Sequence, residues 1–222
     1  MMKLSLSLSL LGLLGVASVV PAAADSLNLN TGNGSSAYTI TSDTLNPNEG
    51  TTATVVTSMA PLWVNDLTSE WIAPQADQSW GDNFGVVQDT GSVTYDTSFF
   101  LPVGFSGASL NITLAADDWA TISLNGNPVF YTGPDTGEWK FDTIIPDSPG
   151  VDSQLVSGLN TLEFVVYNTG GGNDAGGGPT GLNAQVSVNY STSAVPEPST
   201  ALPLGLAIVL GGWALHRRPA IA

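Results

Sequence analysis

Residues 182–190 read Leu-Asn-Ala-Gln-Val-Ser-Val-Asn-Tyr, and this stretch decides the fold. Every apolar residue in it alternates with a polar one. Successive side chains of a β-strand point to opposite faces, so the apolar side chains share one face of a sheet and the polar ones share the other. The stretch therefore predicts a half-buried strand.

The same alternation returns in residues 92–99, 110–114 and 162–166, whereas residues 25–190 hold no sustained helical spacing of apolar residues. Residues 122–124 lead into Asn125-Gly126, a pair that readily adopts the two positive φ angles of a type I′ turn, so we expect a hairpin there. Short strands separated by Gly, Pro, Asn and Asp indicate an all-β fold, an antiparallel β-sandwich with one core.

The composition fits one medium-sized packed domain. The chain has 222 residues, of which 42% are hydrophobic and only 10% are charged. This is too apolar and too weakly charged for a disordered chain. The formal charge is −15, with 19 acidic residues against 4 basic ones.

The charge and the missing residue types exclude several functions. Residues 25–190 hold 18 carboxylates against Lys140 alone, so nucleic acid and other polyanions are not expected ligands. There is no Cys, and His216 is the single His, which excludes Ser-His-Asp and Cys-His nucleophiles and the usual zinc ligands in that region. Carboxylate chemistry and hard cations such as calcium are left, and solubility alone would also explain the acidity.

The N-terminus has the pattern of a secretory signal peptide over residues 1–24. Lys3 precedes an apolar run over residues 4–20, and the segment ends Pro-Ala-Ala-Ala. Small residues at Ala22 and Ala24 match a signal-peptidase site, so we expect export and cleavage after Ala24. A retained membrane anchor is the alternative, but an anchor would carry more apolar length.

The C-terminus, residues 191–222, joins a linker to a second apolar segment. Residues 201–215 are mostly apolar and are followed by His216, Arg217 and Arg218. As a helix they would reach about 22 Å, a marginal span of a hydrocarbon core of about 30 Å. By the positive-inside rule the arginines stay cytoplasmic, which places the preceding residues on the outer face of the membrane.

The order Val195-Pro196-Glu197-Pro198, apolar segment, Arg217-Arg218 resembles the PEP-CTERM sorting signal of Gram-negative bacteria that produce exopolysaccharide. The resemblance implies recognition by an exosortase after export, transient anchoring in the inner membrane, and a final place in the cell envelope, at the cell surface or in the extracellular matrix. Pro203, His216 and residues 219–222 depart from the usual pattern. A plain C-terminal anchor is the alternative.

The central region is similar to the galactose-binding-like jelly-roll ectodomains found among PEP-CTERM proteins, over nearly all of residues 27–190. The order of the blocks carries the resemblance, and the blocks are residues 65–74, 93–102, 116–126, 158–164, Asn168 and 178–182. It implies a jelly-roll β-sandwich that is often associated with carbohydrate, without a known ligand or reaction.

Asp117, Asp118 and Trp119 are the first candidate site, expected in a loop at the end of a sheet. The adjacent carboxylates could hold calcium, and a sugar ring could stack on the indole. The alternative is structural, because Asp in a turn commonly accepts hydrogen bonds from backbone N–H groups and Trp is usually in the core. No cofactor is predicted, apart from calcium as a candidate structural ion.

Tyr131, Glu138 and Trp139 form the second candidate site, in a loop that suits sugar stacking or a plug at the open end of the sandwich. Trp63, Trp71 and Trp80 are expected in the core. Residues 170–178, GGGNDAGGG, predict a flexible surface loop.

These observations predict a non-enzymatic, exported protein that binds or embeds in extracellular polysaccharide. Signal peptidase and exosortase are the expected partners during export, and the apolar tail contacts the membrane before processing. The alternative is a carbohydrate-active enzyme, because glycoside hydrolysis needs only a suitable pair of carboxylates. A structural envelope protein without a ligand is a third possibility.

Overall fold

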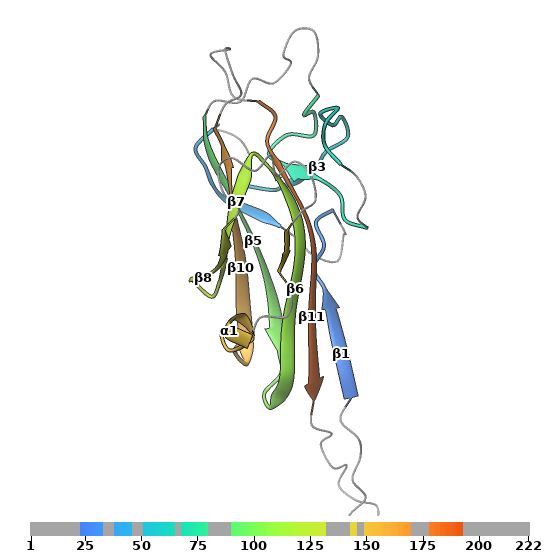
Figure 1. Cartoon of the computed structure of the whole chain (residues 1–222), viewed down its shortest axis with the longest axis vertical. Helices are drawn as coiled ribbons and strands as arrows, with labels where there is room; N and C mark the ends of the chain where they lie inside the picture. Colours follow the sequence, from blue (N-terminus) through green and yellow to red (C-terminus); the bar gives the residue numbers. More distant parts are fainter. Residues whose placement is uncertain are drawn as a thin grey trace, which may run out of the picture. The chain divides into compact units, whose positions relative to one another are not determined.

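The protein is an all-β sandwich of two antiparallel sheets, seen in a computed structural model (Figure 1). The structure describes residues 23–32, 38–45, 51–64, 68–79, 90–131, 143–145, 149–169 and 178–192. The predictions on residues 1–22 and 193–222, on most of the loop 170–178, on Trp80 and on Trp139 lie outside these residues. They stay predictions.

Sheet A is the six-stranded sheet of the described residues, and β11 and β6 run through its middle. Its strands are β1 (Ala23–Asn28), β3 (Thr54–Val55), β4 (Ile72–Ala73), β6 (Phe105–Asp117), β9 (Thr143–Ile145) and β11 (Gly181–Thr192). The order is β3-β4-β11-β6-β9, and β1 also pairs with β11. The strand predicted over residues 182–190 is thus confirmed as β11, a central strand of sheet A.

Sheet B packs against sheet A and has five strands within the described parts of the chain, in the order β2-β5-β10-β7-β8. Its strands are β2 (Thr39–Asp43), β5 (Gly91–Leu101), β7 (Trp119–Leu124), β8 (Asn127–Tyr131) and β10 (Gly158–Asn168). A four-residue helix, α1 (Pro149–Asp152), precedes β10. The alternation in residues 92–99, 110–114 and 162–166 correctly predicted β5, β6 and β10.

The core lies between the inner faces of the two sheets, and the alternating apolar residues fill it. Leu182, Ala184, Val186 and Val188 of β11 have no exposed surface, nor do Leu162, Phe164 and Val166 of β10. Burying a Leu, Val or Phe side chain in this way contributes about 1.5–3 kcal/mol to the stability of the fold. The period of two in the sequence is therefore the side-chain geometry of strands that are buried on one face.

The predicted hairpin joins β7 to β8. Asn125 has φ 52° and Gly126 has φ 77°, the two positive angles that a type I′ turn requires. The Asn125 amide also anchors the turn, because its Oδ1 accepts from the backbone N–H of Thr161 at 2.9 Å and its Nδ2 donates to Oδ1 of Asn160 at 2.9 Å.

The sandwich has two distinct ends, which position the sites described below. At the Asp117 end, Asp117 of β6 pairs with Gly181 of β11. At the Val103 end, residues 102–104 join β5 to β6, and Phe105 pairs with Thr192. Ala23 pairs with Thr192 as well, so β1 begins where β11 ends (Figure 1).

Candidate functional site

Asp117 is the last residue of β6 and is buried, with 8% of its surface exposed. Its Oδ2 accepts a hydrogen bond from Nε1 of Trp63 at 2.6 Å, and its carbonyl accepts one from Oγ1 of Thr180 at 2.9 Å. The peptide bond from Asp117 to Asp118 is cis. The side chain thus fastens the segment that carries Trp63 to the end of sheet A.

Burial raises the pKa of Asp117 to about 8, since a charged carboxylate is poorly solvated there. The bond from Trp63 acts in the opposite direction, because an N–H donor favours the charged form. The neighbouring carboxylate of Asp118 raises the pKa further. At neutral pH the Asp117 carboxyl is therefore largely protonated.

Asp118 lies at the bend between β6 and β7, where the chain passes from sheet A to sheet B. Its Oδ2 accepts from the backbone N–H of Thr169 at 2.7 Å and from Oγ1 of Thr169 at 2.8 Å. Its own backbone N–H donates to the carbonyl of Tyr167 at 2.8 Å. The side chain therefore holds the chain that leaves β10, which is the structural role that a turn Asp commonly has.

The candidate calcium site consists of these two carboxylates. One oxygen of each already accepts a hydrogen bond, and the described residues contain no group of three or more His, Cys, Asp or Glu placed to hold a metal ion. Calcium takes six to eight oxygen ligands, so carbonyls or water would have to supply the others. Calcium binding here stays a prediction.

Trp119 opens β7 on the outer face of sheet B and stacks on Tyr167 of β10. The ring centroids are 3.8 Å apart and the planes are inclined by 9°. Both side chains are partly exposed, and register places them directly opposite each other. The sequence singled out Trp119 but not Tyr167, which reaches this place only through the pairing of β10 with β7.

The remaining predicted aromatic residues divide into two groups. Trp63 and Trp71 are buried and stacked, with centroids 4.1 Å apart, so the prediction that they lie in the core is confirmed. Tyr131 ends β8, but its side chain is not among the described parts, and Trp139 with Glu138 lies outside the described residues. The sugar-binding role of Tyr131 and Trp139 stays a prediction.

A hollow of about 170 Å³ lies on the outer face of sheet A, away from these residues. We call it the amide groove, and it is lined by Asn28, Asn30, Asn111, Thr113, Gln185 and Ser187, with Val186. Register assembles it across three strands, because Asn28 pairs with Ser187, Ser187 with Asn111, and Gln185 with Thr113. The groove is thus built from polar positions of β1, β11 and β6, together with Asn30, which follows β1.

Some side chains that line the amide groove make hydrogen bonds within the protein, and others do not. Asn30 Oδ1 accepts from the backbone N–H of Val186 at 2.9 Å, and Gln185 Nε2 donates to Oγ1 of Thr68 at 2.9 Å. By contrast, the side chains of Asn111, Thr113 and Ser187 make no hydrogen bond within the described part of the chain. Their donors and acceptors are accessible to a ligand in the groove.

The groove carries no charge, which is unusual for this acidic chain. The strands of sheet A contain two charged residues, Asp25 and Asp117, and neither lines the groove. The uncharged character of the groove is partly visible in the sequence, because the polar residues among 182–190 are all amides or hydroxyls. Strand register was needed to bring Asn28 and Asn111 beside them.

A pair of carboxylates occupies the outer face of sheet B. Asp96 of β5 lies directly opposite Glu163 of β10, and Oε1 of Glu163 accepts from Oγ of Ser123 at 3.1 Å. Partial burial raises the pKa of Asp96, as does the charge of Glu163, while a hydrogen bond from Thr41 lowers it. Like charges placed opposite each other repel, so this pair costs stability unless a ligand or a proton relieves it.

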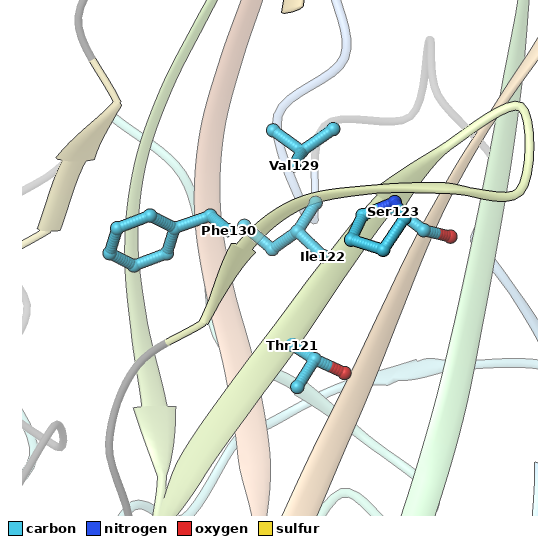
Figure 2. Close-up of a pocket in the computed structure, with 6 residues that line it drawn as sticks. Thr121, Ile122, Ser123, Val129 and Phe130 are labelled. Carbon is cyan, nitrogen blue, oxygen red and sulfur yellow. The ribbon is translucent and has the colours of Figure 1, made fainter.

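A wide, shallow pocket of about 600 Å³ lies beside this pair, along the β7–β8 hairpin (Figure 2). Thr121, Ile122, Ser123, Pro128, Val129 and Phe130 line it. Figure 2 shows the hydroxyls of Thr121 and Ser123 on the same side of β7, while the ring of Phe130 points away from them. The hairpin was predicted from the sequence, but this pocket was not.

Among the described residues, no helix has the length and apolarity that crossing a membrane requires. The predicted sorting helix over residues 201–215 lies outside them.

The comparisons with known proteins show a distant likeness in fold. No protein-family model matches the chain, and no curated protein matches it. A solved structure, the rhamnosidase from Novosphingobium sp. PP1Y, is similar with a TM-score of 0.35 and 17% sequence identity. The similar region covers 77% of this chain and 16% of the rhamnosidase chain. These comparisons assign the chain to no family, and its description as a β-sandwich rests on its own two sheets.

Proposed function

We propose that this protein is an exported, non-catalytic surface module that binds neutral extracellular polysaccharide through the amide groove. One observation carries the proposal. The groove is a hollow on a sheet face where Asn111, Thr113 and Ser187 have hydrogen-bonding groups that the described protein does not use. Such groups suit a ligand that is rich in hydroxyls.

The chemistry of the groove favours a neutral sugar chain over other polymers. An Asn side chain both donates and accepts, and a hydroxyl does the same, which matches the hydroxyls of a sugar on both counts. No cation in the groove would pair with a sulfate, phosphate or carboxylate, and the net charge of −15 repels polyanions. The ligand class is therefore an uncharged glycan.

The route to the cell surface belongs to the same proposal. The signal peptide pattern of residues 1–24 and the PEP-CTERM resemblance of residues 195–218 support export, exosortase sorting and transient anchoring in the inner membrane. β1 begins at Ala23, so cleavage after Ala24 would remove the pairs that Ala23 and Ala24 make with Thr192 and Ser191. The strand would then keep residues 25–28.

The finer fold assignment is also a proposal, a galactose-binding-like jelly roll. The chain changes sheet between β5 and β6, again between β6 and β7, and again between β10 and β11. Repeated crossing between two antiparallel sheets supports that assignment.

The test is binding of the full chain, held in mild detergent, to neutral and acidic polysaccharides on affinity gels. We expect retention on at least one neutral glycan and none on acidic ones. The double substitution Asn111→Ala with Ser187→Ala removes two ligand hydrogen bonds of about 1 kcal/mol each, so affinity should fall at least about tenfold.

The matched control is Thr94→Ala with Ser98→Ala, on the outer face of sheet B, which should bind like the unchanged chain. Absence of binding to every neutral glycan would contradict the proposal. Equal losses in the two double variants would contradict the assignment to the amide groove.

A carbohydrate-active enzyme is the second candidate, and the Asp96–Glu163 pair favours it. Two carboxyl groups on opposing positions, one with a raised pKa, have the general requirements for glycoside hydrolysis. Release of reducing ends from a polysaccharide would support it, provided that Asp96→Asn and Glu163→Gln each abolish the release. No turnover on the glycans that bind the protein would exclude it for them.

A further inference from the structure

Exposed apolar side chains gather at the Val103 end of the sandwich. Val103 is 89% exposed, Leu159 66%, Phe100 62% and Val156 47%. The other large hydrophobic residue that is exposed in the described part of the chain is Leu62, in the segment of Trp63 at the Asp117 end. A cluster of this kind commonly marks a surface that contacts a protein or a membrane.

Strand pairing brings these residues together. Leu159 of β10 lies directly opposite Phe100 of β5, and the neighbouring pair is Gly158 with Leu101. Val103 follows at once in the turn that joins β5 to β6, where the backbone N–H of Phe105 donates to the carbonyl of Pro102 at 3.3 Å. These apolar side chains therefore share one end of the sandwich.

The chain enters and leaves the sandwich at this same end. Thr192, the last residue of β11, pairs with Phe105, two positions after Val103. Ala23, the first residue of β1, pairs with Thr192. Figure 1 shows the start of β1 beside the end of β11. Residues 201–215 are therefore attached to the sandwich at the Val103 end, as residues 4–20 are before the predicted cleavage after Ala24.

The length of chain between Thr192 and the predicted sorting motif is short. Val195 is three residues after Thr192, so it lies at most about 11 Å from the end of β11. Ala201, where the apolar segment begins, is at most about 32 Å away. If that segment is in a bilayer, the Val103 end cannot be far from the lipid.

The segments that carry these exposed apolar side chains are also uncharged, and Asp25 of β1, opposite Tyr190 of β11, is a carboxylate near the same end. Residues 97–116 and 153–162 contain no charged side chain, in a chain whose net charge is −15. Charged side chains would have to lose hydration at a lipid surface, whereas Phe, Val and Leu gain by leaving water. The local composition therefore suits contact with lipid.

We propose that the Val103 end is a membrane-contact surface, with Phe100, Val103, Val156 and Leu159 seated in the outer leaflet of the inner membrane. The contact would hold the sandwich against the bilayer and keep Val195–Pro198 at the lipid surface, where a membrane-bound sorting enzyme acts. The inference rests on the predicted membrane insertion of residues 201–215.

An exposed apolar cluster could also contact a second copy of the chain. The bilayer is favoured because the tether holds this end near lipid at any protein concentration, whereas self-association requires that two copies meet. The experiment below separates the two.

The chain contains no Cys, so a single introduced Cys can be labelled specifically. Full-length Val103→Cys is labelled with an environment-sensitive fluorophore and reconstituted into phosphatidylcholine–phosphatidylethanolamine vesicles that contain a nitroxide-headgroup lipid. The matched control is Leu62→Cys, an exposed apolar position at the Asp117 end. We expect a blue shift and lipid quenching at position 103, and neither at position 62.

A second variant separates contact of the apolar cluster with lipid from attachment through residues 201–215 alone. Phe100→Ser with Leu159→Ser, introduced into Val103→Cys, replaces two exposed side chains and should reduce the quenching at position 103. Quenching that is unchanged in this variant, or equal at positions 62 and 103, overturns the proposal. A blue shift that depends on protein concentration and comes without lipid quenching would indicate contact with a second copy and would also overturn the proposal. A chain that fails to float with the vesicles would overturn it as well.

Discussion

Trp63 donates its indole N–H to the carboxyl of Asp117 at 2.6 Å, across 54 positions of the chain. The bond joins a buried tryptophan, itself stacked on Trp71, to the last residue of β6. Asp117, the first of the predicted site residues, is thus buried against Trp63. Its protonation state therefore affects the stability of the fold.

The first prediction is that acid stabilises the protein through Asp117. Its pKa is raised from 3.8 in the unfolded chain to about 8 in the fold. Between these values the folded chain keeps a proton that the unfolded chain has lost, so stability falls as pH rises through this range, by at most about 1.4 kcal/mol per pH unit. Urea unfolding between pH 5 and pH 8 measures the slope.

Asp117→Asn is the companion variant. Its amide oxygen can still accept from Trp63, and its amide nitrogen can donate to Asp118. We expect a flatter pH dependence and a higher free energy of unfolding than the unchanged chain at pH 8. The same pH slope in both proteins would assign the dependence to other groups, such as Asp96.

The second prediction compares two buried tyrosines. The hydroxyl of Tyr38 donates to the carbonyl of Leu29 at 2.7 Å, whereas the hydroxyl of Tyr95 is buried without a hydrogen-bond partner among the described residues. Tyr95→Phe should therefore stabilise the fold by about 1 kcal/mol, and Tyr38→Phe should destabilise it by about the same amount. Thermal unfolding of the two variants checks the sign. A loss in both would mean that the Tyr95 hydroxyl is bonded in solution.

The third prediction concerns the Asp96–Glu163 pair. Glu163→Gln removes a like-charge repulsion between opposing positions and leaves an oxygen that accepts from Ser123. We expect a gain of about 0.5 kcal/mol at low salt. The gain should shrink in high salt, because the charges are partly exposed. Chemical unfolding at two salt concentrations measures it, and a destabilised variant would show that the pair does more than repel.

The fourth prediction tests the packing of Trp63. A Cβ added at Gly181 would lie 2.8 Å from Cη2 of the Trp63 indole and 3.2 Å from the carbonyl oxygen of Ile72. Gly181→Ala should therefore cost about 1–3 kcal/mol and change the tryptophan fluorescence. Gly178→Ala is the control, since nothing lies within 4 Å of its added Cβ. Equal effects of the two substitutions would argue against this close packing.

The candidate site could be predicted only in part. Asp117, Asp118 and Trp119 do lie at the end of a sheet, because a strand that stops and a strand that starts leave a local pattern. The expected loop is reduced to Asp118, since Asp117 is still the last residue of β6 and Trp119 is already the first of β7. Their partners could not be found in this way. Trp63 and Thr169 reach the two carboxylates from distant parts of the chain, through the packing of separate strands and loops.

The sequence by itself determined the long strands β5, β6, β10 and β11, the face that each of them buries and the turn at Asn125-Gly126, but it did not predict β1–β4 or β9. These are local properties, since alternation and positive φ angles follow from the geometry of neighbouring residues. Only the tertiary structure decided which strands are neighbours. Pairing β1 with β11 and β11 with β6 created the amide groove, and pairing β10 with β5 gathered the exposed apolar residues near Val103. Register depends on the packing of the whole core, which no local stretch of sequence contains.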